Sequence, residues 1–169
     1  MKHPIFYFER FRPWDSISFL IYVIISVSIY LNLRGLVDWG NRAENLVMYT
    51  IGTHLLLYFV NYKSLRNFSV FILWLAIGLV HFVFYMQLRL DSSLEMAKGH
   101  SATGLRNTVI LLILFQALRI LSLNVQKQEF VAVSRGRYDL FDERKLNILD
   151  VAIFIIYFAS SMGLLFLWE

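Results

Sequence analysis

The chain has 169 residues and a formal net charge of +4; 58% of its residues are apolar and 17% are charged. An ordinary soluble domain has roughly 45–50% apolar and about 25% charged residues. So much apolar surface excludes a disordered chain, and the absence of cysteine excludes disulfide scaffolds, thiol enzymes and cysteine-ligated metal sites. We therefore predict an all-α integral membrane protein that forms a single domain over residues 1–169.

The gaps between charged residues define five apolar segments. A helix needs about 20 apolar residues, with a range of roughly 17–25, to cross the hydrocarbon core. Backbone polar groups in lipid must be paired within the segment, which favours helices for runs of this length. In chain order the predicted spans are approximately residues 16–33, 45–62, 67–88, 107–126 and 150–168.

The second span is the most polar of the five, because it contains Asn45, Thr50, Thr53, His54 and Asn61. A four-span protein in which residues 45–62 are re-entrant is therefore an alternative. With five spans, ten Lys and Arg residues fall on the side of the amino terminus and five on the other. The positive-inside rule then places the amino terminus in the cytoplasm and the carboxyl terminus outside a plasma (inner) membrane.

Two longer polar connections join these spans. Residues 89–106 predict a short amphipathic helix that ends near Gly99. Residues 127–149 predict a small hairpin around Ser134, followed by a helix that Asp142 caps and that continues into the fifth span. This second connection is interpreted as a linker on the lipid headgroups, or as a docking surface for a cytoplasmic partner.

Each predicted span places one polar residue at a similar depth, near the middle of the bilayer. These residues are Ser26, His54, His81, Gln116 and Ser161. Polar groups are costly at this depth, so they are the first candidates for a functional site.

The two histidines allow three interpretations. As axial ligands they would hold a b-type haem between two helices, with Gly78 leaving room for the ring. Alternatively, His54 and His81 form a quinone or proton-relay site together with Tyr58, Tyr85 and Gln116. The third interpretation is that these residues only bind one another and hold the helices together.

Two further features concern packing. Arg119 is the only charged residue well inside a predicted span, and we expect a structural ion pair with Asp150 at the start of the fifth. Ala159 and Gly163 form a small-xxx-small pair, which favours close packing of the fifth helix within the chain or against another subunit.

These observations favour a non-catalytic integral membrane subunit or accessory protein of a larger complex, whose partners are the bilayer and other membrane proteins. Zinc-protease, nucleophile-elbow and nucleotide-binding motifs are absent, and no basic face with interleaved aromatics indicates nucleic acid. An electron- or proton-transfer subunit that binds haem or quinone is the alternative. A small transporter is a third possibility, although the broken-helix signals of such proteins are missing.

Overall fold

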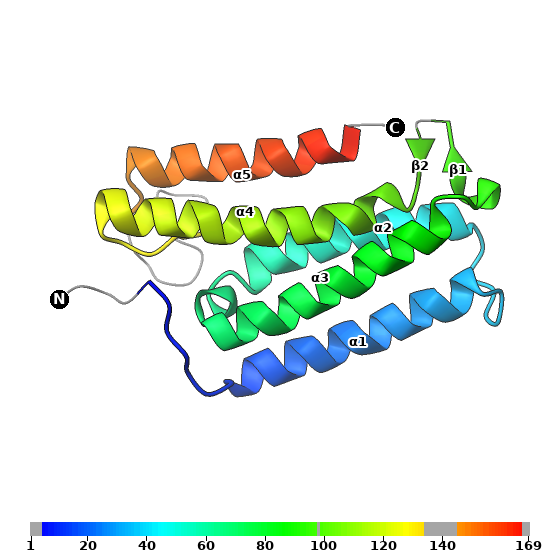
Figure 1. The fold of residues 1–169 in the computed structure, drawn as a ribbon, viewed down its shortest axis with the longest axis horizontal. Coiled ribbons are helices and arrows are strands. Elements are labelled where there is room, and N and C mark those ends of the chain that lie inside the picture. The colour runs from blue at the N-terminus through cyan, green and yellow to red at the C-terminus, as the bar shows by residue number, and fades with distance from the viewer. Residues whose placement is uncertain (1–4, 98, 134–144, 167–169) are drawn as a thin grey trace.

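Five α-helices run roughly parallel along the long axis of the molecule (Figure 1). The computed structural model describes residues 5–97, 99–133 and 145–166, without the side chains of residues 165 and 166. The helices are α1 (Pro13–Leu33), α2 (Arg42–Leu55), α3 (Phe68–Leu88), α4 (Thr103–Gln126) and α5 (Ile148–Phe166).

Short elements occupy two of the connections. A π-helix, Leu56–Val60, continues α2, and a 3₁₀ turn, Ser64–Arg66, leads into α3. On the way to α4 the chain forms a 3₁₀ turn, Ser92–Leu94, and two antiparallel strands, β1 (Glu95–Met96) and β2 (Gly99–His100). A π-helix is rare, and its backbone hydrogen bonds span five residues and not four. The helical geometry therefore changes shortly after His54.

Side-chain caps define where the helices begin. α1 has Pro13 in its first turn, and the Asp15 carboxylate accepts a hydrogen bond from the Arg12 backbone N–H at 2.8 Å. Asn41 and Asn67 cap α2 and α3 by accepting backbone N–H groups of the first turn. At the start of α5, Asn147 and Asp150 accept each other's backbone N–H groups, both at 2.9 Å.

Three of the described helices are long and apolar enough to cross a membrane, namely α1, α3 and α4. The described apolar stretch of α5, Ile148–Leu164, is shorter. α2 does not meet this criterion, because it has only 14 residues and contains polar side chains, among them the buried Thr50, Thr53 and His54. The structure thus supports an all-helical membrane protein.

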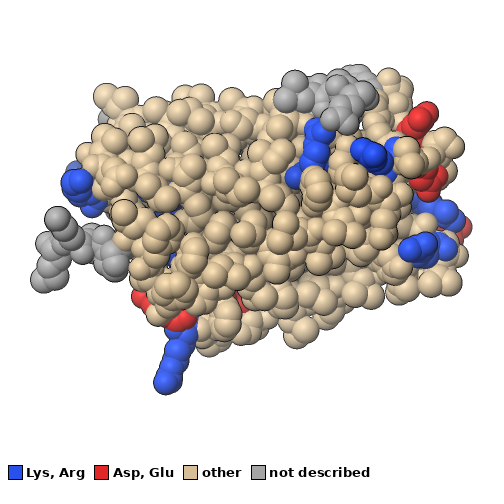
Figure 2. Space-filling model, viewed as in Figure 1, with Lys and Arg blue, Asp and Glu red and all other residues tan. Residues whose placement is uncertain are grey.

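α4 is the central helix, and α1 is the most peripheral of the three long ones. Half of the most apolar stretch of α4 is buried, against 17% of that of α1. The larger core cluster surrounds Trp74, Phe115 and Tyr58, and a smaller one surrounds Leu46, Tyr85 and other residues toward the opposite end. Most of the charged side chains on the face shown in Figure 2 lie near the two ends, which leaves an uncharged belt between them.

Some predicted boundaries require correction. The connection at 89–106 is not an amphipathic helix: it holds a 3₁₀ turn and β1–β2, because Gly99, with φ +104°, adopts a turn conformation that favours glycine. α4 begins at Thr103 and not at 107, and α2 gives way to the π-helix before residue 62. The hairpin predicted around Ser134 and the cap at Asp142 lie outside the described residues.

Candidate functional site

His81, on α3, connects four helices through its imidazole ring. Nε2 lies 3.1 Å from the hydroxyl of Tyr22 on α1 and 2.8 Å from the hydroxyl of Tyr49 on α2. Nδ1 lies 3.2 Å from Oγ1 of Thr108 on α4. His81 is only 3% exposed, so these contacts replace water as its hydrogen-bond partners.

The hydroxyl groups around His81 are also bonded to one another. The Tyr49 hydroxyl donates to the Tyr22 hydroxyl at 2.8 Å and lies 2.7 Å from the Ser26 hydroxyl. Thr53 Oγ1 lies 3.0 Å from the Tyr22 hydroxyl. We call these six residues the His81 network: Tyr22, Ser26, Tyr49, Thr53, His81 and Thr108. Hydroxyl hydrogens rotate, so such a chain can exchange one partner for a ligand oxygen without breaking up.

A cavity of about 500 Å³ lies between α1, α2 and α3, and the His81 network forms part of its wall through Ser26, Tyr49 and His81. Its other walls are mainly apolar. Val27 and Val80, which also line it, are about half exposed on the outer surface of the bundle. The cavity therefore extends from the lipid-facing surface to a buried hydrogen-bonding group, and its volume is typical of sites for small molecules.

Charged residues line the cavity where it approaches the end of α1. Arg34 follows α1, and its Nε donates to the Tyr30 hydroxyl at 3.1 Å. Asp91 also lines the cavity, and the hydrogen bonds from the side chain and backbone of Ser93 hold the pKa of Asp91 below its usual value. The cavity thus has polar groups at the His81 network and near the end of α1, with mainly apolar walls between them.

His54, on α2, lies in different surroundings. It is buried, and neither ring nitrogen has a hydrogen-bond partner among the described residues. It lines a small cavity of about 20 Å³ between α2, the π-helix and α5, together with Tyr157 and Ser161. A volume of about 15 Å³ is enough for one water molecule.

The structure does not bring His54 and His81 onto one cavity. His81 lines the large cavity and His54 the small one. Gly78 leaves no room for a ring, because a Cβ there would lie 3.2 Å from side-chain atoms of Val109 and Leu112 on α4. This geometry does not favour a haem held by both histidines.

The other predicted site residues lie apart from His81. Tyr58 stacks on Tyr157 with ring centroids 4.6 Å apart, and lines the small cavity beside His54. Tyr85 belongs to the smaller core cluster, and the Arg106 guanidinium lies 5.5 Å from its ring centroid. Gln116 donates from Nε2 to the Leu65 carbonyl at 2.8 Å.

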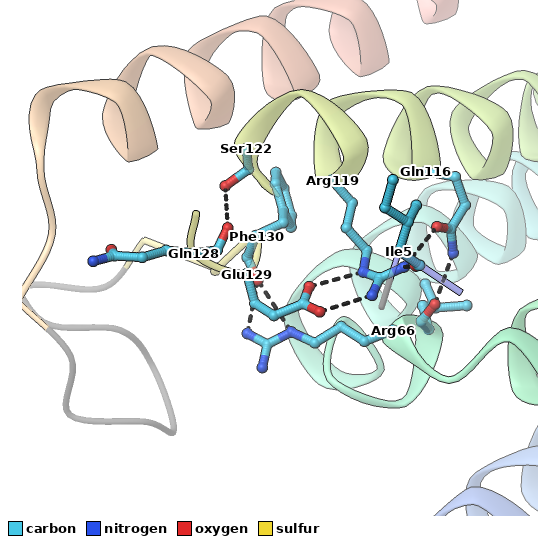
Figure 3. Close-up of polar contacts among 9 residues, drawn as sticks. Ile5, Arg66, Gln116, Arg119, Ser122, Gln128, Glu129 and Phe130 are labelled. Carbon is cyan, nitrogen blue, oxygen red and sulfur yellow. Dashed lines mark hydrogen bonds and ion pairs between the residues drawn. The ribbon is translucent and has the colours of Figure 1, made fainter. Parts of the chain in front are cut away.

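Arg119 lies at the centre of a second polar cluster, at the end of the bundle where α1 begins (Figure 3). Its side chain is fully buried and donates two hydrogen bonds to the Glu129 carboxylate, at 2.8 and 2.7 Å. Nη1 donates to the Ile5 carbonyl at 2.8 Å and also lies 3.4 Å from the Gln116 side-chain oxygen. The nearby Arg66 donates twice to the Phe130 carbonyl.

The predicted ion pair between Arg119 and Asp150 is therefore wrong, because Arg119 pairs with Glu129. Glu129 lies in the segment that folds back from the end of α4, only ten residues after Arg119, and its carboxylate matches the guanidinium in a two-bond geometry. Asp150 instead accepts from Gln126 Nε2 at 2.8 Å and caps α5 together with Asn147.

Ala159 and Gly163 of α5 point away from the rest of the described chain. Ala159 is exposed, and a Cβ added at Gly163 would meet no atom within 4 Å. Ile155, Ile156 and Phe158 are exposed on the same helix. The sequence allowed this side of α5 to pack within the chain or against another subunit. In the described structure, it does not pack within the chain.

Comparisons with protein-family models, with curated proteins and with solved structures find no match for this chain. Within the described ranges, no group of three or more His, Asp or Glu residues is placed to hold a metal ion. The interpretation of the sites therefore rests on their geometry.

Sequence reasoning missed Tyr22, Tyr49 and Glu129. The first two had a usable signal, because Tyr22–Ser26 and Tyr49–Thr53 are polar pairs four residues apart, which places each pair on one side of a helix. Glu129 had none, since its pairing depends on how the chain folds back after α4.

Proposed function

We propose that this chain is a membrane protein that binds a lipid-soluble ligand of the quinone class in the cavity beside His81. The observation that carries this proposal is the 500 Å³ cavity, which joins the lipid-facing surface to Ser26, Tyr49 and His81. A quinone is apolar apart from its ring oxygens, and these are hydrogen-bond acceptors. The hydroxyl of Tyr49 or Ser26 would donate to one ring oxygen, and His81, 2.8 Å from the Tyr49 hydroxyl, would hold that hydroxyl in place.

Ligand binding and mutation test this proposal together. A decyl-tailed benzoquinone should quench the fluorescence of Trp74. The ring centroids of Trp74 and Tyr22, a member of the His81 network, lie 4.9 Å apart. Replacement of His81 by Leu, or of Tyr49 by Phe, should weaken binding about tenfold, because one hydrogen bond is worth about 1–1.5 kcal/mol. His54→Leu should bind normally. Equal losses in the His54 and His81 variants would instead favour a site shared by both histidines, and no saturable quenching would refute the proposal.

A second function, that of an accessory subunit of a larger membrane complex, is supported by α5. The side that carries Ala159 and Gly163 is exposed, and small residues allow a partner helix to approach closely in lipid. If this side contacts a subunit, Gly163→Leu should release that subunit during purification in mild detergent while the variant itself stays folded. Retention of the same stoichiometric partner by the variant, or a wild-type protein that purifies alone, would contradict this function.

The proposed topology has five spans, with the amino terminus in the cytoplasm. Two observations support the number of spans: α1 begins and α5 ends at opposite ends of the bundle (Figure 1), and α2, extended by the π-helix, lies alongside the long helices. The excess of Lys and Arg on the side of the amino terminus supports its cytoplasmic placement. Single cysteines placed at residues 10 and 90 should therefore react with a membrane-impermeant reagent from opposite sides. Labelling from the same side would refute this topology.

A further inference from the structure

The segment Ile5–Arg12, which we call the strap, is fixed to the bundle by its backbone. The buried Arg119 donates to the Ile5 carbonyl at 2.8 Å, and the Phe68 N–H donates to the Tyr7 carbonyl at 3.0 Å. The Asn67 side chain accepts from the Glu9 N–H at 3.2 Å and donates to the Glu9 carbonyl at 3.0 Å. Four hydrogen bonds thus hold a segment that has no regular secondary structure of its own.

The strap nevertheless exposes three of its four aromatic side chains. Phe8 is 68% exposed, and Phe6, Phe11 and the adjacent Trp14 are each about half exposed. Ordered aromatic side chains at the end of a membrane bundle are most stable in the interfacial layer, where their rings leave water and polar groups stay hydrated. The backbone bonds therefore hold the rings at the level where the bundle leaves the hydrocarbon.

The exposed charges around the strap are mostly positive. Among the described residues at this end, the exposed cations are Arg10, Arg12, Lys127 and Lys145, and the exposed carboxylate is that of Glu9. Glu9 lies 3.3 Å from Arg12, which leaves the cations in excess. Anionic lipid headgroups attract such clusters by about 1 kcal/mol for each basic residue near the surface.

We propose that the strap and its neighbouring cations bind the anionic headgroups of the membrane surface at this end of the bundle. Phe6, Phe8, Phe11 and Trp14 insert at the level of the headgroups, and Arg10 and Arg12 contact lipid phosphates. Arg119, by holding the Ile5 carbonyl and Glu129 together, is a positioning residue for this surface. This inference does not depend on ligand binding at His81.

Quenching of Trp14 by brominated lipids tests the inference in the reconstituted full-length chain. The difference between the wild type and Trp14→Phe isolates the signal of Trp14. At equal mole fraction, brominated phosphatidylglycerol should quench Trp14 more strongly than brominated phosphatidylcholine. The double substitution Arg10→Gln/Arg12→Gln should abolish this preference, and Arg10→Lys/Arg12→Lys should restore it, because the charge is retained.

The matched control is Arg42→Gln/Arg89→Gln, which removes two exposed arginines from the opposite end of the bundle and should leave the preference intact. Equal quenching by the two lipids in the wild type would overturn the inference, as would an equal loss in the control, which would indicate a general effect of net charge. A thermal midpoint equal to that of the wild type shows that the Gln variant is folded. If that variant is unfolded, the inference is still tested by comparing the quenching by the two brominated lipids in the wild type and in the Lys variant.

Discussion

The two polar clusters inside this bundle differ in whether their side chains line a cavity. In the Arg119 cluster, the buried guanidinium donates to Glu129, to the Ile5 carbonyl and to Gln116, and Arg119 lines neither of the two cavities described above. In the His81 network, the imidazole is also bonded at both nitrogens, but two of its neighbours, Ser26 and Tyr49, are partly exposed and line a cavity of about 500 Å³.

The difference separates a polar cluster that holds chain segments together from the one for which we propose a ligand. Both contain groups that are expensive to bury in lipid. Arg119 satisfies that cost with partners from three chain segments, and so it ties those segments together. The His81 network has hydroxyl groups that can change partners at a cavity wall, and so it can accept a ligand. Substitutions in the two clusters should therefore differ in what they disturb.

The largest effect is expected for Arg119→Leu. This change removes two hydrogen bonds to the Glu129 carboxylate and one to the Ile5 carbonyl, and breaking a buried pair costs about 3–5 kcal/mol. The Glu129 side chain is 24% exposed, so the lower end of this range applies. Thermal unfolding in detergent measures the loss of free energy of unfolding.

Arg89→Leu is the control for that change, because Arg89 is exposed just beyond the end of α3. It should alter the free energy of unfolding by no more than about 0.5 kcal/mol. A stable Arg119→Leu protein with wild-type strap geometry would show that the Glu129 pair contributes little.

His81→Phe and His54→Phe compare two buried histidines directly. The first change removes one hydrogen-bond partner each from Tyr22, Tyr49 and Thr108. Because the two tyrosines keep each other as partners, the total cost should be about 1–3 kcal/mol. The second exchanges a ring without partners among the described residues for an apolar one, and should be neutral or stabilising. Equal destabilisation would show that His54 is bonded through an internal water, which His54→Gln would then partly restore.

Glycines provide a comparison of helix contacts that does not involve polar groups. A Cβ at Gly104 on α4 would lie 2.4 Å from Thr50 Oγ1 on α2, so Gly104→Ala should force the helices apart and cost about 1–2 kcal/mol. Gly163→Ala meets nothing in the described structure and should gain a few tenths of a kcal/mol from its higher helix propensity, on a scale that spans about 1 kcal/mol. Denaturant titration of the two variants gives both values, and similar values would mean that α2 and α4 do not cross closely at Gly104.

Hydropathy predicted the helices because it depends only on local sequence. The predicted spans coincide with α1, α3 and α4 to within a few residues, and the polar second segment is indeed where the helix becomes irregular. Depth along the helix was not enough to predict the site. Gln116 was placed level with His81, but it bonds to Leu65 near Arg119, because helix rotation and offset determine which residues meet.

The contacts of Arg119 were predicted only in part for a similar reason. Its burial and its need for a carboxylate followed from a charge inside an apolar segment. The identity of that carboxylate did not, since Glu129 reaches Arg119 only after the chain turns at Lys127, with φ +57°, and the Ser122 hydroxyl donates to the Gln128 carbonyl at 2.8 Å in the returning segment. Tertiary reversals of this kind have no periodic signal in the sequence.

The smallest effect is expected from Tyr7, a strap residue whose ring lies beside Arg119. The Arg119 guanidinium carbon lies 5.3 Å from the Tyr7 ring centroid. Burial raises the pKa of the Tyr7 hydroxyl above its usual value of 10.0, and the nearby Glu129 carboxylate raises it further. The folded protein then holds this proton more tightly than the unfolded one, so the contribution is fully present below pH 10 and is lost as the pH rises through the raised pKa. Tyr7→Phe should flatten the fall in thermal midpoint above pH 10 and leave the midpoint near pH 7 almost unchanged. An identical alkaline profile for Tyr7→Phe would mean that the strap does not shield this hydroxyl from water.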